Sequence, residues 1–144
     1  MYRIKRKFSS LLILYMFFSS IYAQEKETVH LNFDVNSKET CKVLKDGGGY
    51  LSVQKFKKIK QKNGSIDFYI CEELFSFKRN LNPDIRNIKH LKSIKISKIE
   101  DLKNIVNKIN PLYPHDVFNK VFLVEKTNDS TIAIYDVKWQ YYIE

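Results

Sequence analysis

The chain has 144 residues, of which 44% are hydrophobic and 28% charged, and its formal net charge is +9. This is the length of one ordinary domain, enough for one hydrophobic core but not for two. Lysine outnumbers arginine by 21 to 4. Because arginine is the usual residue for bidentate contacts to bases and phosphates, this composition argues against sequence-specific nucleic-acid binding.

The first 23 residues have the pattern of an export signal. Four basic residues precede an uninterrupted apolar run from Leu11 to Phe18, and the small residue Ala23 follows. The run is shorter than the roughly 20 residues of a membrane-spanning helix, so we predict a signal peptide cleaved after Ala23, with an uncleaved signal anchor as the alternative. The mature protein is then a single domain of residues 24–144 with a net charge of +5, because 21 basic residues remain against 16 acidic ones. We expect it in the periplasm or outside the cell, with no further membrane span.

Cys41 and Cys71 are the two cysteines of the chain. In an oxidising compartment an even number of cysteines favours a disulfide, which we predict here. Two buried free thiols, a thiol catalyst or a metal-binding pair are the alternatives.

The N-terminal part of the mature chain predicts strands. Residues 28–34 alternate, with Val29, Leu31 and Phe33 on one face, and a second short strand follows around Cys41 to Leu44. Three glycines at 47–49 then interrupt the pattern before strand-like residues resume at 50–53. A phosphate-binding loop would lead into a helix with a following Lys and Ser/Thr, so we interpret the glycines as a hairpin connection.

Asn63-Gly64 is a strong signal for a two-residue hairpin turn. If these two residues form the loop, Lys60 lies opposite Asp67 and Ile59 lies opposite Phe68. The second strand of the hairpin can then continue to Leu74. One predicted face is largely apolar, and the opposite face carries Phe56, Lys58, Lys60, Tyr69 and Cys71.

Two helices are predicted in the middle of the chain. Asn82-Pro83-Asp84 can open a short helix, and Ser97-Lys98-Ile99-Glu100 matches a capping box that begins a better one. The second helix should end near Asn110, because a proline follows. Its apolar residues recur at helical spacing and are interpreted as core, with a partner-binding face as the alternative: Ile99, Leu102, Ile105, Val106 and Ile109.

The chain ends in a second predicted hairpin. Residues 120–126 and 131–142 flank a polar turn around Asn128-Asp129. The last strand gathers aromatic residues on one face, which we interpret as core and not as an exposed stacking platform. The predicted fold is α+β: about six mostly antiparallel strands, with hairpins at Asn63-Gly64 and Asn128-Asp129, and one or two helices packed on one face.

The sequence contains few signs of catalytic chemistry. The three histidines are isolated, and no metal-binding spacing or nucleophile elbow occurs, so we predict no catalytic, cofactor or metal residues. The residues that come closest to a catalytic set are Cys71 with Glu72, Glu73 and His115.

Five lysines between residues 55 and 62 form the densest basic run. In one interpretation Phe56, Lys58, Lys60 and Tyr69 share a basic, aromatic face that binds an acidic protein or an anionic glycan. In the other, the lysines protect an edge strand from pairing with another chain.

The sequence therefore predicts a small exported, non-enzymatic binding domain. An exported inhibitor or immunity-type protein for an acidic partner is the first alternative, and a small hydrolase or thiol enzyme is the second.

Overall fold

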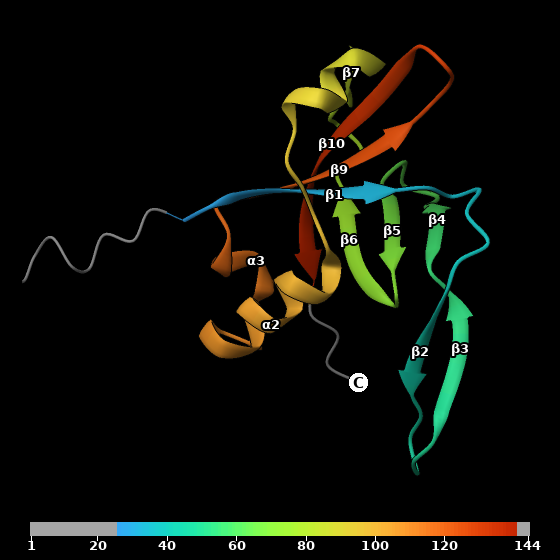
Figure 1. Cartoon of the computed structure of the whole chain (residues 1–144), viewed down its shortest axis with the longest axis vertical. Coiled ribbons are helices and arrows are strands. Elements are labelled where there is room, and N and C mark those ends of the chain that lie inside the picture. Colours follow the sequence, from blue (N-terminus) through green and yellow to red (C-terminus); the bar gives the residue numbers. More distant parts are fainter. Residues whose placement is uncertain (1–25, 141–144) are drawn as a thin grey trace, which may run out of the picture.

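A computed structural model of the chain describes residues 26–140. The predicted signal peptide and the last residues of the predicted final strand lie outside this part. The described residues form ten strands, one 3-10 helix and two α-helices (Figure 1). Their bounds are β1 Thr28–Phe33, β2 Thr40–Leu44, β3 Tyr50–Gln54, β4 Phe56–Lys60, β5 Ile66–Ile70, β6 Glu73–Phe77, β7 Asp84–Asn87, η1 Ile88–Ser93, β8 Ile96–Ser97, α2 Ile99–Ile109, α3 Pro114–Val117, β9 Lys120–Lys126 and β10 Thr131–Gln140.

Eight of these strands form one sheet in the order β4-β5-β6-β10-β9-β1-β8, with β7 also paired to β10. Strand β1 runs parallel to β8 and β9, and the other pairs are antiparallel. The long strand β10 pairs with β9 along one edge and with β7 and then β6 along the other. The α+β class is confirmed, but the expected number of strands was too low.

The main core lies where β4, β5 and β6 cross the face formed by β1, β9 and β10 (Figure 1). Phe33 of β1 contacts the rings of Phe56 and Phe68 at centroid distances of 5.4 and 5.0 Å, and Phe68 in turn contacts Tyr135 at 4.8 Å. These contacts join opposite ends of the strand order, so the sheet folds back over itself. Helices α2 and α3 add Leu102, Val106 and Val117 to the same core.

The centre of β10 is buried on both faces. Ile132 and Ile134 form a second core cluster with Val124, against which Ile88, Leu91 and Ile94 of the η1 region pack. Tyr135, Val137 and Trp139 face the main core. The interpretation of this aromatic face as core is therefore confirmed for its described residues.

Helix α2 agrees with its prediction in position and end, but only part of its apolar stripe is covered. It ends at Ile109 with Asn110 as its C-cap residue, close to the expected end. Lys98, and not Ser97, is the N-cap residue, and it makes no side-chain capping bond. Ile99, Leu102 and Val106 are buried, whereas Ile105 and Ile109 are 37% and 65% exposed.

The predicted register of the Asn63-Gly64 hairpin was wrong by one residue. The turn has three residues: the amide of Gln61 donates to the carbonyl of Ser65 at 2.9 Å, and Gly64 has φ of +85°. Lys60 therefore lies opposite Ile66, and Ile59 opposite Asp67. A slip of one residue exchanges the two faces of a strand, so Phe56 and Lys58 turn toward the core.

The chain turns again at Cys71 and Glu72, where we expected a continuous strand. These two residues connect β5 to β6 and have φ angles of 51° and 69°. Positive φ at both loop positions is the geometry of a type I′ turn, which usually contains glycine or asparagine.

Residues 84–87 form strand β7 and not the predicted helix. They pair with Thr131–Ile134 of β10, and the helical segment begins only at Ile88. Its cap is Asn87, whose side-chain oxygen accepts from the amide of Lys89 at 2.9 Å, because pairing with β10 holds the preceding residues extended. No helix in residues 26–140 has the length and hydropathy to cross a membrane.

Candidate interaction surface

The hairpin formed by β2 and β3, residues 40–54, is a separate two-stranded sheet that projects from the body of the domain (Figure 1). We call it the arm. Three glycines with positive φ form its tip, where the amide of Lys45 donates to the carbonyl of Gly49 at 3.0 Å. The predicted hairpin connection is thus confirmed.

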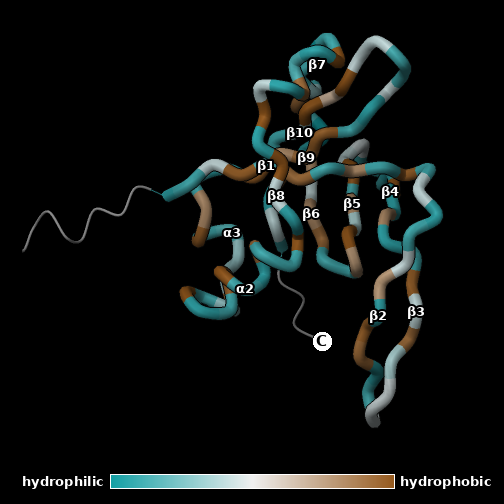
Figure 2. Tube along the Cα trace, viewed as in Figure 1, coloured by the Kyte–Doolittle hydropathy of each residue, from teal (hydrophilic) through white to brown (hydrophobic). Residues whose placement is uncertain are grey.

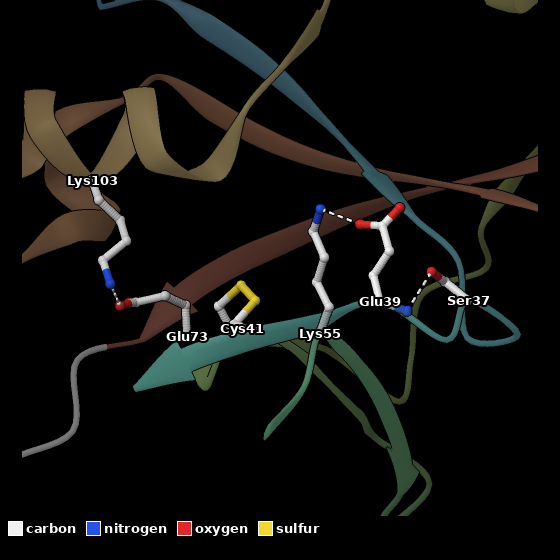
Figure 3. The surroundings of a disulfide bond; sticks show 7 residues. Ser37, Glu39, Cys41, Lys55, Glu73 and Lys103 are labelled. Carbon is white, nitrogen blue, oxygen red and sulfur yellow. Dashed lines mark hydrogen bonds and ion pairs between the residues drawn. A yellow bond between two sulfur atoms is a disulfide. The ribbon is translucent and has the colours of Figure 1, made fainter. Parts of the chain in front are cut away.

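The base of the arm is fixed by a covalent bond and by polar contacts (Figure 3). The predicted disulfide is confirmed: it joins Cys41 of β2 to Cys71, with Cα atoms 5.5 Å apart. The backbone of Lys55 donates to the carbonyl of Glu39 and accepts from the amide of Cys71, at 2.9 and 2.8 Å. The ammonium of Lys55 also pairs with the carboxylate of Glu39 at 2.6 Å. An isolated two-stranded hairpin is marginal in water, so these contacts hold the arm in place.

Hydrophobic residues occur along both strands of the arm (Figure 2), and three large ones are exposed. Leu44, Tyr50 and Leu51 are 67%, 72% and 43% exposed. Leu44 and Tyr50 lie opposite each other next to the tip, so they share one face of the ribbon. Leu51 lies opposite Val43 and therefore on the other face. Exposed apolar groups on a projecting element are typical of a contact surface.

Two lysines, Lys42 and Lys45, lie close to Leu44 in the arm. Lys42 lies on the same strand two residues from Leu44, which places both on one face. Lys45 follows at the tip, and neither ammonium has an ion-pair partner among the described residues. The arm therefore presents leucine and tyrosine beside uncompensated positive charge.

The four residues proposed as an anion-binding face do not share one surface. Phe56 is 4% exposed and belongs to the core. Lys58 lies on the core side of β4, and Lys60 is exposed at the end of that strand. Tyr69 lies on the opposite side, where the ammonium of Lys57 sits 5.6 Å from its ring. The assignment of these residues to one face was wrong because it followed from the incorrect register.

Lys58 belongs to a buried polar cluster. Its ammonium lies 2.6 Å from Oε2 of Glu125, the one charged residue among the described residues that is classed as buried, and the hydroxyl of Tyr135 donates to the same oxygen at 3.0 Å. Burial alone would lower the pKa of Lys58, but the hydrogen bond and negative charge of Glu125 raise it overall. Burial and the charge of Glu125 also raise the pKa of Tyr135. The cluster joins β4, β9 and β10 across the core.

The strand order fits the other interpretation of the lysines between residues 55 and 62, in which they protect an edge strand from pairing with another chain. Strand β4 is the end strand of the large sheet, with β5 as its neighbour. Lys57 and Lys60 are exposed on this strand. Charged side chains on an edge strand oppose pairing with another chain.

The catalytic set suggested by the sequence, Cys71 with Glu72, Glu73 and His115, lacks a nucleophile in the structure. Cys71 is bonded and has no thiol to act as a nucleophile. Glu73 accepts from the indole nitrogen of Trp139 at 3.0 Å and pairs with Lys103 at 2.8 Å (Figure 3). His115 lies on α3 and contacts Asp116 at 3.6 Å. Among residues 26–140, no group of three or more acidic, histidine or cysteine side chains has a geometry suited to a metal ion.

His30 occupies a half-buried position on β1, stacked on Phe122 at a centroid distance of 5.0 Å. Burial, and secondarily the charge of His90, lower the pKa of His30. This pair of histidines is remote in sequence and was not predicted to interact.

Comparisons of the chain with protein-family models, curated protein sequences and solved structures found no match. The arm's geometry and chemistry are accordingly the basis for a functional assignment.

Proposed function

We propose that the protein is a small exported binding domain that engages an acidic protein partner through the arm. The observation that carries this proposal is the exposure of Leu44, Tyr50 and Leu51 on a projecting hairpin whose base is covalently fixed. Tyrosine is enriched among residues that dominate binding energy, because it buries a large area with few rotatable bonds.

Charge complementarity supports an acidic partner. Lys42 and Lys45 lie beside Leu44, and residues 24–144, the predicted mature chain, have a net charge of +5. Complementary charges at the rim of an interface accelerate association and favour the correct partner. Lys42 and Lys45 would therefore surround a contact that Leu44 and Tyr50 make at its centre.

The fixed base also fits an inhibitor or immunity-type protein with one cognate partner. A segment that is already held in its bound shape loses less conformational entropy on binding. Such a protein would use the same surface, and it would differ from a general binding domain only in the number of partners.

Site-specific cross-linking in the cells that produce the protein tests the proposal. A photoreactive phenylalanine replaces Tyr50 on the arm, and a control variant carries it at Tyr113, which is also exposed but lies outside the arm. We expect the position-50 probe to cross-link to a protein of net negative charge, whereas the position-113 probe should not. Equal cross-linking from both positions, or cross-linking only to a second copy of this chain, would contradict the proposal.

Charge reversal provides a second readout. The Lys42→Glu/Lys45→Glu variant should reduce the cross-link yield at position 50 and leave the melting temperature unchanged. Added salt should have the same effect on the yield, because exposed charge pairs are screened. A yield that is insensitive to both changes would remove the acidic partner from the proposal.

A further inference from the structure

A cleft of 320 Å³ lies at the point where β10 leaves β9 and begins to pair with β6. The pairing with β9 extends to Val137, opposite Val121, and the pairing with β6 starts at Lys138, opposite Ser76. Residues from β6, α3, β9 and β10 line the cleft, and none of them belongs to the arm. Its volume lies in the range of small-molecule sites, roughly 300 to 1,000 Å³.

The cleft carries uncompensated positive charge. Lys78, Lys120 and Lys138 line it together with one carboxylate, that of Asp136. The ammonium of Lys120 pairs with Asp136 at 3.1 Å. The ammonium groups of Lys78 and Lys138 have no ion-pair partner in the part of the chain that the structure describes. A concave surface with this charge attracts anions.

Neutral polar groups accompany the lysines. The hydroxyl oxygen of Ser76 accepts from the side-chain amide of Gln140 at 2.7 Å, which leaves its own hydrogen available to donate. Asn119 donates through Nδ2 to Thr28 at 3.4 Å, and its Oδ1 atom accepts no hydrogen bond from the described residues. A hydroxyl that can donate and an amide oxygen that can accept suit a ligand that carries several hydroxyls.

Apolar residues shape the remaining wall. Phe118 and Trp139 are 5% and 1% exposed and stack with ring planes 3° apart. Leu81, on the other hand, is 46% exposed and lies at the edge of the cleft. The cleft thus combines a rigid wall with one accessible aliphatic side chain.

We propose that this cleft binds a sugar acid, a single hexuronate ring, either free or as the end unit of an anionic polysaccharide. Lys78 and Lys138 bind the carboxylate, and the Ser76 hydroxyl and the Asn119 carbonyl bind the ring hydroxyls. The combination of two free cations with neutral donors and acceptors distinguishes this ligand from a simple anion and from a neutral sugar. The site is separate from the arm and does not depend on the function proposed for it.

Titration of the isotopically labelled protein with glucuronate, followed by amide chemical shifts, tests the site. Methyl glucoside is the neutral control, and acetate is the control for charge alone. We expect glucuronate to shift the amides of residues that line the cleft, and to bind at least tenfold more tightly than either control. Equal binding of methyl glucoside or acetate, or shifts located elsewhere, would overturn the proposal, as would the absence of shifts at millimolar glucuronate.

Matched lysine variants separate the site from general surface charge. Lys78→Gln/Lys138→Gln should weaken glucuronate binding at least tenfold. Lys89→Gln/Lys92→Gln removes the same charge from η1, outside the cleft, and should leave binding unchanged. An equal loss in both variants would contradict a defined site. Ser76→Ala tests the hydroxyl contact and should weaken glucuronate but not acetate, and equal effects on both would overturn the assignment of a sugar ring.

An oligouronide distinguishes the two sources of the ligand. Tighter binding of the oligomer than of the monomer, with the same dependence on Lys78 and Lys138, supports a polysaccharide end unit. Equal affinities support a free sugar acid. Oligomer binding that the double variant does not weaken would overturn the proposal.

Discussion

Replacement of Lys58 by methionine should destabilise the domain strongly, although the sequence presents this residue as one of five lysines in a solvated run. In the structure its ammonium lies 2.6 Å from a carboxylate oxygen of Glu125, whose side chain is 9% exposed. Methionine fills a similar volume but leaves that carboxylate with the hydroxyl of Tyr135 as its one remaining donor among the described residues.

The expected cost follows from the burial of the pair. Breaking a buried ion pair by removing one partner costs about 3 to 5 kcal/mol. The Lys58 side chain retains 28% exposure, so water can partly replace the ammonium, and we expect about 3 kcal/mol, the lower end of that range. Urea unfolding measures the change, because Trp139 is the single tryptophan and is buried.

Lys60→Met is the matched control. Lys60 lies on the same strand and the same face but is exposed, and it has no ion-pair partner among the described residues. Its replacement should change the free energy of unfolding by no more than about 0.5 kcal/mol. The double variant Lys58→Met/Glu125→Leu should be more stable than Lys58→Met, because it leaves no buried carboxylate without its cation, although the Tyr135 hydroxyl then loses its acceptor. A cost for Lys58→Met as small as that of the control, or a double variant no more stable than Lys58→Met, would refute this reasoning.

Three further predictions concern the disulfide and pH. Replacing Cys41 and Cys71 by serine should lower the free energy of unfolding by about 3 to 4 kcal/mol, since the bond closes a loop with a sequence separation of 30 residues; urea unfolding measures this loss, and an unchanged free energy of unfolding would contradict it. Because the folded-state pKa of His30 is lowered, the unfolded chain binds its proton more readily, so stability should fall as pH drops through 6.5, and His30→Gln should reduce that fall in melting temperature between about pH 7 and pH 5. The pKa values of Lys58 and Tyr135 are raised in the folded state. Their contribution to stability is therefore fully present below their ordinary pKa values of 10.5 and 10.0, and it should be lost as pH rises through the folded-state values. Unfolding curves at alkaline pH should show this loss, and Lys58→Met should diminish it.

The elements with strong periodic patterns were predictable from the sequence. Strand β1 alternates cleanly, and its residues Val29, Leu31 and Phe33 are buried as expected. Helix α2 combines a 3.6-residue apolar pattern with a proline that limits its end. In each case local pattern and tertiary burial favour the same structure.

The errors arose where tertiary pairing or turn geometry overruled the local signal. Asn63-Gly64 suggested a two-residue loop, but a three-residue loop changes the register and moves Lys58 from the surface to the core side. The turn at Cys71 and Glu72 lacks the glycine or asparagine that usually marks positive φ. Residues 84–87 pair with β10, and that long-range partner could not be inferred from an Asn-Pro-Asp signal.

The candidate sites also divide into features that local sequence predicts and features that depend on tertiary packing. The disulfide was predicted from the even number of cysteines and the expected compartment, and the hairpin of the arm was predicted from its glycines. Exposure of Leu44 and Tyr50 depends instead on which elements cover them, and their alternating pattern resembles that of a half-buried strand. The cleft at β6 and β10 draws residues from four elements that are distant in the chain, so no local spacing could indicate it.

The disulfide connects two features that would each be unstable alone. Cys71 and Glu72 adopt positive φ without glycine, a conformation that persists only where surrounding contacts enforce it. The arm is a two-stranded ribbon, which is marginal without support. Cys41, Cys71 and the backbone of Lys55 join the two at one point, so the unusual turn in the body of the domain is also the support of the arm. The exposed tip can therefore change by mutation without disturbing the core that holds its base.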